Sequence, residues 1–350
     1  MSKSIVYFIP YNNKEKNLNY LKEKIEKVFS LTKFLEKLNY GRKLAIKVHF
    51  GEEGNNNHLR PEYVRIIAEL VAQKTIQPYL VETATLYRGK RNNKKEHVQL
   101  AWEHGFTLDN TLCQIEILDG NAGERYYEVI INSQYTKKAK IAQKLRRYLY
   151  LINLAHFKGH LATGFGGVLK NLGMGLAAKG GKLDMHSSSH PFVNENKCIG
   201  CGICVDYCKE GAIKIHNEVA KIGPLCVGCA GCLAICPNHA IEFRWDQSTD
   251  ILAKKVLEYA KATLINRYAL HFNFLINITP NCDCYPKTEE KIMEDVGILI
   301  SFDPLACDQA GFDLTKKVIT KLYAHLNYDE IFDFGEKIGL GKREYELCEI

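Results

Sequence analysis

Eight cysteines in two copies of one spacing constrain this chain of 350 residues more than any other feature. Each copy reads C-x-x-C-x-x-C-x-x-x-C, and the second copy begins 28 residues after the first. The first copy consists of Cys198, Cys201, Cys204 and Cys208, and the second of Cys226, Cys229, Cys232 and Cys236. Three cysteines in so tight a loop can bind three irons of one [4Fe–4S] cube, and the fourth reaches a second cube from beyond a helical turn.

The spacing therefore predicts two [4Fe–4S] clusters whose ligands are exchanged between the copies, as in the bacterial two-cluster ferredoxins. One cluster is expected on Cys198, Cys201, Cys204 and Cys236, and the other on Cys226, Cys229, Cys232 and Cys208. Two zinc sites or a disulfide framework are the alternatives, but zinc ligands usually come as two separated C-x-x-C pairs. A chain with two such clusters is expected to carry electrons.

The repeat includes more than the cysteines, and it predicts a small ferredoxin-like α+β domain over residues 191–245. Each half reads as a cluster loop, a helical turn and a short strand. A domain of about 55 residues is near the size at which bound metal must supply the stability that a small core cannot. Because this domain interrupts the rest of the chain, residues 1–190 and 246–350 are expected to form one discontinuous domain.

In that larger domain, strand-like and helix-like patterns alternate, which predicts an α/β fold with a mostly parallel sheet. The first expected strands cover residues 44–50, 79–82, 113–118, 127–132 and 148–155, and the first helices cover 61–73, 94–104 and 168–178. The alternation continues through residues 250–262, 271–278, 296–302 and 305–326. The first 40 residues carry one long amphipathic helical pattern.

The formal net charge is +7, from 47 lysines and arginines against 40 aspartates and glutamates. Eight cysteinates and two oxidised cubes would reduce this charge to roughly +3. The basic excess therefore largely offsets the cofactors, and no nucleic-acid partner is expected. Basic stretches at residues 22–37 and 137–147 are typical of solvated helix faces, with a phosphate-binding stripe as the alternative.

No targeting or membrane segment is visible in the sequence. The apolar run from Ile5 to Ile9 is too short for a signal peptide and is closed by Pro10, and no window approaches the ~18 apolar residues of a membrane helix. The cluster spacing favours a reducing compartment over one that forms disulfides. We therefore expect a cytoplasmic protein without membrane insertion, served by a redox partner protein.

A glycine-rich segment over residues 155–186 is the second concentration of chemical signals. A predicted strand leads into the segment, a loop with three glycines follows, and a predicted helix begins directly after the loop. Free amides at a helix N-terminus suit a small ligand with anionic or carbonyl oxygens. The candidate cofactor-binding residues of this segment are His156, Lys158, His160, Gly164, Gly166, Gly167, Lys170, Asn171 and His186. Close helix packing is the alternative, and it accounts well for Gly173 and Gly175.

Other candidate residues lie outside this segment. His49 ends a predicted strand and His58 follows an asparagine-rich loop, so both could either line the carboxyl edge of the sheet or bond their own loops. Asp303 precedes a proline and is predicted to cap a helix rather than to bind a metal. Cys282 and Cys284 are predicted to be buried or free thiols, with a third metal site as the alternative.

Three long motifs are shared with a known family. They are KVHFGEEGNNNHLRPEYV near residue 47, HFKGH…GFGG…KNLGMG…KLDMH leading into KCIGCG, and SFDPLACDQAGFDL near residue 301. On these motifs the chain resembles an uncharacterised Fe–S-center family, the domain of unknown function 362. The resemblance implies an α/β domain with an inserted two-cluster ferredoxin, in anaerobic redox metabolism, and it assigns no catalytic role to any residue.

From these patterns we expect an electron-transferring iron–sulfur protein whose α/β domain holds a small ligand. A chain needed only as a carrier would end at the ferredoxin-like domain, so the protein is expected to be an oxidoreductase that delivers electrons to the glycine-rich segment. A flavin or a flavin-like ring, such as a lumazine or a deazaflavin, would convert single electrons into pairs. A non-enzymatic carrier or adaptor that docks a redox partner is the alternative, and cluster assembly or redox sensing is a third class.

Overall fold

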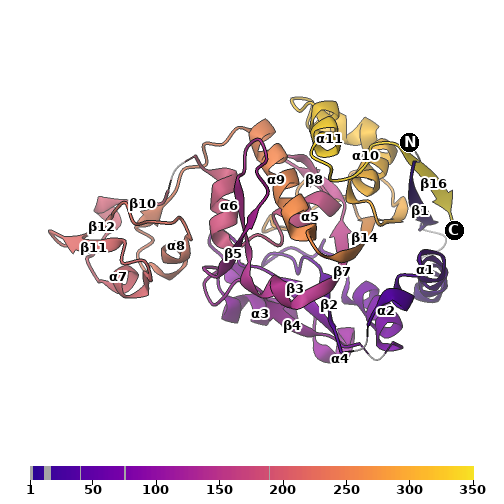
Figure 1. The fold of residues 1–350 in the computed structure, drawn as a ribbon, viewed down its shortest axis with the longest axis horizontal. Coiled ribbons are helices and arrows are strands. Elements are labelled where there is room, and N and C mark those ends of the chain that lie inside the picture. The colour runs from indigo at the N-terminus through magenta and orange to yellow at the C-terminus, as the bar shows by residue number, and fades with distance from the viewer. Residues whose placement is uncertain (1–2, 12–16, 40, 75, 189) are drawn as a thin grey trace.

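The computed structural model describes residues 3–11, 17–39, 41–74, 76–188 and 190–350. These residues form a large α/β body with a small lobe at one end (Figure 1). The lobe extends from β10 (Phe192–Val193) to β13 (Ile241–Glu242), and the terminal strands lie at the far end of the body.

Within the described ranges, the body is built on a sheet of eight strands in the order β16-β1-β15-β14-β7-β2-β3-β4. The strands are β1 (Ser4–Pro10), β2 (Lys43–Lys47), β3 (Pro78–Glu82), β4 (Gln114–Ile117), β7 (Tyr148–His156), β14 (Tyr268–Leu275), β15 (Gly297–Ser301) and β16 (Tyr345–Glu349). β15 runs antiparallel to β1 and β14, and every other neighbouring pair is parallel. The prediction of an α/β fold with a mostly parallel sheet is confirmed.

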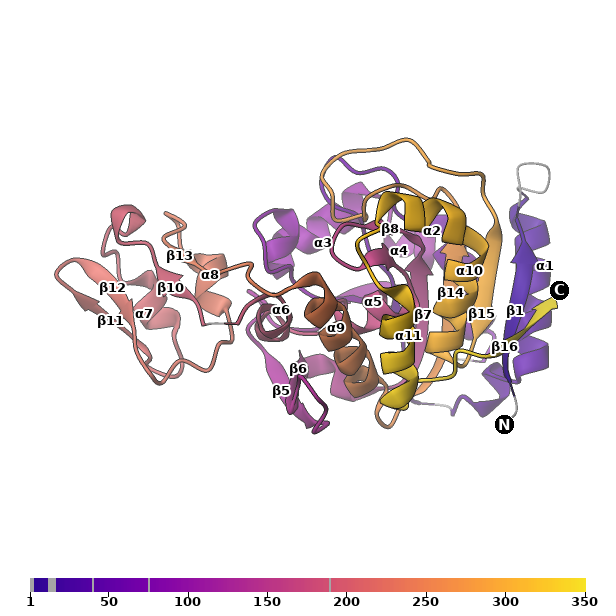
Figure 2. The ribbon, with the colours of Figure 1, turned by 90° about the horizontal axis from the view of Figure 1, so that it is seen from above.

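Helices cover both faces of this sheet and bury an apolar core on each (Figure 2). One face is covered by α1 (Leu18–Thr32), α2 (Pro61–Ala72), α3 (Lys94–Glu103) and α4 (Leu108–Thr111). The other face is covered by α5 (Val168–Gly173), α9 (Thr249–Leu264), α10 (Pro304–Leu322) and α11 (Tyr328–Lys337). The strands supply both cores by alternation, because Ile152 and Leu154 of β7 join the first core whereas Leu151 and Ala155 join the second.

The strand order reverses between β2 and β7, since β3 and β4 extend the sheet to one side and β14 extends it to the other. In open α/β sheets, a crevice forms at such a reversal, outside the carboxyl ends of the strands. Here His49 follows β2, and Lys158 follows β7. The fold therefore places two candidate residues where sheets of this kind bind ligands.

Most expected elements are present within three residues of their predicted bounds, but two expectations were wrong. The helix predicted over 168–178 ends at Gly173, and after a break the chain forms α6 (Lys179–His186). A Cβ on Gly173 would lie 2.1 Å from the carbonyl oxygen of Val256, so this glycine serves close packing against α9, and glycine is a weak helix former.

The basic stretch 137–147 is not a helix: β6 (Lys138–Ala142) pairs with β5 (Tyr126–Ile130), and a 3-10 turn follows. The helical pattern expected in the first 40 residues is confirmed as α1, which buries Leu21, Ile25, Val28 and Phe29. The strand β1 precedes this helix and was not predicted. Of these 40 residues, 1–2, 12–16 and 40 lie outside the described residues.

The lobe follows the predicted order of loop, short helix and short strand in each half. In the first half α7 (Ile203–Tyr207) precedes β11 (Ile213–His216), and in the second half α8 (Gly231–Ile235) precedes β13. β13 pairs with β10, and β11 pairs with β12 (Val219–Ile222). Leu86 and Leu183 of the body pack into the lobe's apolar cluster and join the two parts. No helix in the described parts of the chain combines the length and apolarity needed to cross a membrane.

Candidate functional site

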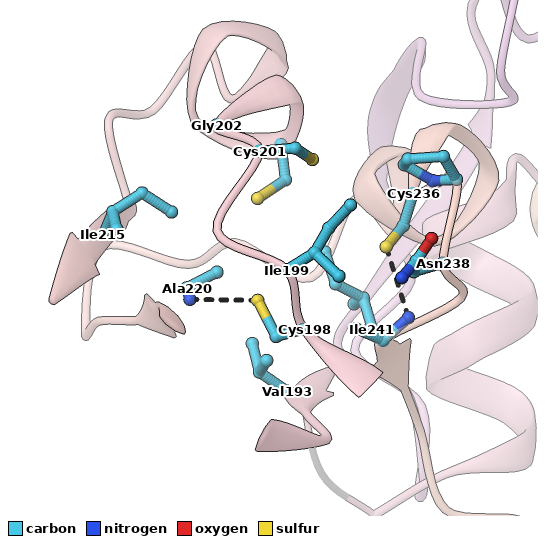
Figure 3. Close-up of a pocket in the computed structure, with 13 residues that line it drawn as sticks. Val193, Cys198, Ile199, Cys201, Gly202, Ile215, Ala220, Cys236, Asn238 and Ile241 are labelled. Carbon is cyan, nitrogen blue, oxygen red and sulfur yellow. Dashed lines mark hydrogen bonds between the residues drawn. The ribbon is translucent and has the colours of Figure 1, made fainter. Parts of the chain in front are cut away.

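Two cavities in the lobe are each lined by four of the eight repeated cysteines. Cys198, Cys201, Cys204 and Cys236 line the first cavity (Figure 3), and Cys208, Cys226, Cys229 and Cys232 line the second. All eight are free cysteines. Each cavity thus combines three cysteines of one copy with the fourth cysteine of the other copy.

Backbone amides point at two sulfurs of the first cavity. The N–H of Ala220 donates to Sγ of Cys198 at 3.3 Å, and the N–H of Ala240 donates to Sγ of Cys236 at 3.2 Å (Figure 3). Apolar side chains form much of the remaining wall, namely those of Val193, Ile199, Ile215 and Ile241. Amide donors of this kind stabilise thiolates and the metal centres bound to them.

A larger cavity of about 450 Å³ lies in the body at the carboxyl edge of the sheet. Its wall includes His49 after β2 and Glu82 at the end of β3. A hairpin from the glycine-rich segment, β8 (Lys158–His160) with β9 (Gly164–Gly166), contributes another part. The volume is typical of a small-molecule site.

The structure brings eight of the eleven candidate binding residues to this cavity. They are His49, Lys158, His160, Gly166, Gly167, Lys170, Asn171 and His186. Gly164 instead packs against Tyr328, and His58 stacks on His104 with ring centroids 4.5 Å apart. His58 therefore follows the loop-bonding alternative, and its Nδ1 contacts the carbonyl oxygen of Leu59.

His156 is the third candidate residue that does not line the cavity, because Asp283 holds it behind the wall. Asp283 carried no signal in the sequence. Its carboxylate lies 2.8 Å from Nδ1 of His156 and 2.8 Å from Nζ of Lys158. Burial alone would raise the pKa of Asp283, but His156 and Lys158 hold it well below its usual range. His156 therefore supports the wall from inside, whereas Lys158 both pairs with Asp283 and lines the cavity.

Charges are concentrated around the cavity, with four basic side chains and one acidic side chain in its wall: Arg91, Lys158, Lys170, Lys182 and Glu82. Lys47 pairs with Glu82 at 2.5 Å. Burial would raise the pKa of Glu82, but Lys47 and Arg91 lower it to about 2, so this carboxylate is ionised. Burial lowers the pKa of Lys182 to about 8. The wall therefore favours an anionic ligand.

Among the described residues, Lys170 is the basic residue of the wall whose side chain lacks a partner. In the part of the chain that the structure describes, no side chain or carbonyl forms a hydrogen bond or ion pair with its Nζ. Burial, and after it the nearby Lys158, lowers the pKa of Lys170 to about 7. An anion bound in the cavity would supply the missing partner and favour the ammonium form.

The helix start that was expected to bind a ligand is used by the protein itself. The carboxylate of Asp308 accepts the N–H of Val168 and the N–H of Leu169, each at 2.8 Å, and also an amide N–H of Asn273. The prediction that a ligand binds these backbone amides was wrong, because a carboxylate from α10 already occupies them.

The capping of α5 by Asp308 predicts that alanine substitutions at two adjacent glycines differ in their effect on stability. A Cβ on Gly167 would lie 2.3 Å from Oδ1 of Asp308, so Gly167→Ala should displace that carboxylate and cost about 2–4 kcal/mol of stability. A Cβ on Gly166 would meet only the lysine side chains of Lys170, at 3.4 Å, and Lys158, at 3.7 Å, so Gly166→Ala should cost less than about 1 kcal/mol. Denaturant unfolding of both variants measures the difference. Equal stabilities would contradict the capping role of Asp308.

Cys282 and Cys284 are joined in a disulfide, so the prediction of free thiols was wrong. The two residues flank the anchored Asp283, and their Cα atoms lie 5.2 Å apart, within the range that a disulfide spans. A ring nitrogen of His160 lies within 4.8 Å of both sulfurs, a grouping compatible with metal binding. Asp303 caps α10 as predicted, accepting the N–H groups of Leu305 and Ala306.

Helix α6 connects the cysteine lobe with the large cavity. At its start, a Cβ on Gly180 would lie 2.7 Å from the carbonyl oxygen of Gly228 and 3.0 Å from Cα of Cys229. Further along the same helix, Lys182 and His186 line the cavity. Helix α6 therefore lies between the cavity and the cysteine loop that contains Cys229.

Sequence reasoning missed several residues of the wall. Arg91, Tyr87 and Trp245 line the cavity, and Trp245 packs edge-on against His186 with ring centroids 4.7 Å apart. Glu82 was also missed, although the sequence carried a signal for it, because it ends a predicted strand at the carboxyl edge of the sheet.

Two solved structures align with this chain at low similarity. A protein from Thermotoga maritima aligns with a TM-score of 0.44 and 12% identity, over 88% of this chain and 60% of its own. The lactate racemase apoprotein from Thermoanaerobacterium thermosaccharolyticum aligns with a TM-score of 0.43 and 11% identity, over 90% of this chain and 57% of its own. The chain therefore spans less than two thirds of either structure.

No curated protein matches the chain significantly. One family model does, and it matches residues 44–313, which include nearly all of β2, the cavity wall, both cysteine groups and about half of α10. The match extends over more than half of the sequence. The chain therefore belongs to the family described as Domain of unknown function (DUF362).

Proposed function

We propose that this protein is an oxidoreductase that passes electrons through two [4Fe–4S] clusters in the lobe to a small anionic ligand in the 450 Å³ cavity. The observation that carries the proposal is the exchanged grouping of eight free cysteines beside α6, the helix that also lines the cavity. A chain that only relayed electrons between partners would need no such cavity.

The spacing of the sulfurs supports clusters over single zinc ions. A tetrahedral zinc with Zn–S bonds near 2.3 Å brings its sulfurs to roughly 3.8 Å from one another. Among the described residues, no three cysteines of the lobe have sulfurs within 4.8 Å of one another. Four thiolates around a multi-iron cube are spread more widely, so the cysteine cavities fit a cube better than a zinc ion.

The charges of the wall support an anionic ligand. Arg91 and Lys182 already have protein partners, whereas Lys170 has none in the described chain. Tyr87 and Trp245 add aromatic surface beside these cations. A flavin-like chromophore with an anionic group is one ligand of this class.

The residues of the chain then have distinct tasks. Lys170 neutralises and orients the ligand, and Lys158 stays fixed because Asp283 holds it. His186 and Trp245 line the cavity together, with their rings packed edge to face. The clusters, when bound, supply single electrons at potentials that hydrogen bonds to their sulfurs help to set.

Anaerobic purification tests the proposal directly. We expect about eight iron and eight acid-labile sulfide per chain, and interacting cubane signals by electron paramagnetic resonance after reduction with dithionite. Mass spectrometry of acid-released small molecules should find an anionic compound, and its absorption spectrum would identify a flavin-like ring. Stoichiometric zinc without sulfide would contradict the clusters. Intact clusters without retained ligand or turnover would favour the carrier alternative.

A further inference from the structure

Cys282 and Cys284 form a disulfide that does little to stabilise the fold. The two residues are only two positions apart, so their bond closes a very small loop. The stabilisation from a crosslink grows with the length of the chain that it closes. In addition, proteins of the reducing compartment that iron–sulfur clusters require rarely keep disulfides except catalytic or redox-sensing ones. A chemical role therefore accounts for this bond better than a structural one.

The pair is held rigidly against the cavity. Asp283, the residue between the two cysteines, is fixed by Lys158 and His156, and its carbonyl oxygen accepts the N–H of Glu52 at 2.9 Å. Cys282 is buried, whereas Cys284 is partly exposed and lines the cavity. One sulfur is thus accessible to a bound molecule, and the other is placed behind it.

The accessible sulfur shares the cavity with basic and polar groups. A ring nitrogen of His160 lies within 4.8 Å of both sulfurs, and the N–H of Thr163 donates to Nδ1 of His160 at 3.1 Å. Because Nδ1 accepts this hydrogen bond, the proton of the neutral ring sits on Nε2, where it can be donated to an acceptor in the cavity. Lys170 and Lys158 line the same cavity. Cationic surroundings of this kind favour the thiolate form of cysteine.

We infer that Cys282 and Cys284 are a redox-active disulfide that collects two electrons from the clusters and holds them as a dithiol at the cavity wall. This inference rests on the proposed function. Two reduced clusters hold two electrons, the number that a disulfide accepts. The S–S bond breaks as two electrons and two protons enter, both clusters are oxidised, and two thiols form. A low-potential one-electron donor then reduces the clusters again.

The protons can come from the cavity itself. Lys170 has a pKa of about 7, lowered by burial, so near neutral pH it can donate one proton, take up another from water and donate that as the second. In this arrangement the chain converts single electrons into a pair through its own sulfurs. Cys284 is the sulfur that would react with a bound oxidised compound, and Cys282 is the sulfur that would re-form the bond.

A reductive titration under anaerobic conditions tests the inference. Dithionite should deliver about four electrons per chain to the wild type, two to the clusters and two to the disulfide. The double variant Cys282→Ser/Cys284→Ser should take about two and keep its iron content and cluster signals. Cys348→Ser, which removes a distant cysteine on β16, is the matched control and should still take about four.

Alkylation and mass spectrometry of the wild type provide an independent measurement. A single tryptic peptide, residues 268–287, contains both cysteines and no other. It should be unmodified in oxidised protein and doubly alkylated after reduction. A wild type that takes about two electrons, with this peptide unchanged, would overturn the inference and leave the clusters intact. A zinc or nickel ion bound per chain and lost in the double variant would also overturn it. Protein without iron or sulfide would instead refute the proposed function.

Discussion

Removing Cys236 together with Cys226 should abolish both clusters, whereas removing Cys236 together with Cys198 should abolish only one. The first pair takes one ligand from each cysteine cavity, and the second pair takes two ligands from the same cavity. Iron should fall from about eight per chain to near zero in Cys226→Ala/Cys236→Ala, and to about four in Cys198→Ala/Cys236→Ala. Iron and sulfide analysis of both purified variants measures this difference.

Each double variant is the control for the other, because both lose two cysteines from the same lobe. If each cluster were instead bound by one copy of the repeat, the two results would be reversed. Cys113→Ser removes a buried cysteine of the body and should leave the iron content unchanged. Equal iron in all three variants would show that these cysteines do not bind the metal.

Local patterns were sufficient wherever one short stretch of chain determines the structure. The proline at the start of α2 and the cap of α10 by Asp303 are determined within one helical turn, and both were predicted. The cysteine repeat is local in the same sense, since each loop carries three of its four sulfurs. The alternation of apolar strands and helices predicted the sheet because buried parallel strands need apolar residues on both faces.

Partners that are distant in sequence could not be predicted. Asp308 caps α5 from 140 positions away, and Asp283 binds His156 from 127 positions away. Neither aspartate differs locally from one that caps its own helix or faces solvent. The strand β1 was missed for the same reason, since it pairs with β15 and β16 near the other end of the chain. The periodicity of apolar residues predicts which face of a segment is buried, but not which distant residue contacts that segment.

The glycine-rich segment shows how the right region was found for a wrong reason. Its glycines suggested amides open to a ligand, yet Gly167 and Gly173 are required by close approaches to Asp308 and to α9. The segment still lines the cavity, because β7 leads it to the reversal of strand order. Its side chains, and Lys170 above all, are therefore the better candidates for ligand binding.

Lys170→Met should weaken anion binding in the cavity by about 10- to 150-fold, the loss expected for a charge-assisted hydrogen bond of about 1.5–3 kcal/mol. Methionine keeps much of the apolar chain length but removes the ammonium group that lacks a protein partner in the described structure. Sulfate is a suitable probe, since its charge stays constant between pH 5 and 9, and calorimetry can follow its binding. Iron content should not change, because Lys170 lines neither cysteine cavity.

The pH dependence separates a direct role of Lys170 from a structural one. Burial lowers the pKa of this lysine to about 7, so the free protein loses the cation as the pH rises through 7. Sulfate affinity of the wild type should therefore be greatest below pH 7 and should fall by up to about tenfold per pH unit above it. The Lys170→Met variant should lose this dependence, whereas Lys317→Met, on the exposed side of α10, should retain it. If the Lys170→Met variant binds sulfate weakly but keeps the wild-type pH profile, the pH dependence comes from another cation of the wall. Lys182 is then the first residue to examine, because burial also lowers its pKa, to about 8.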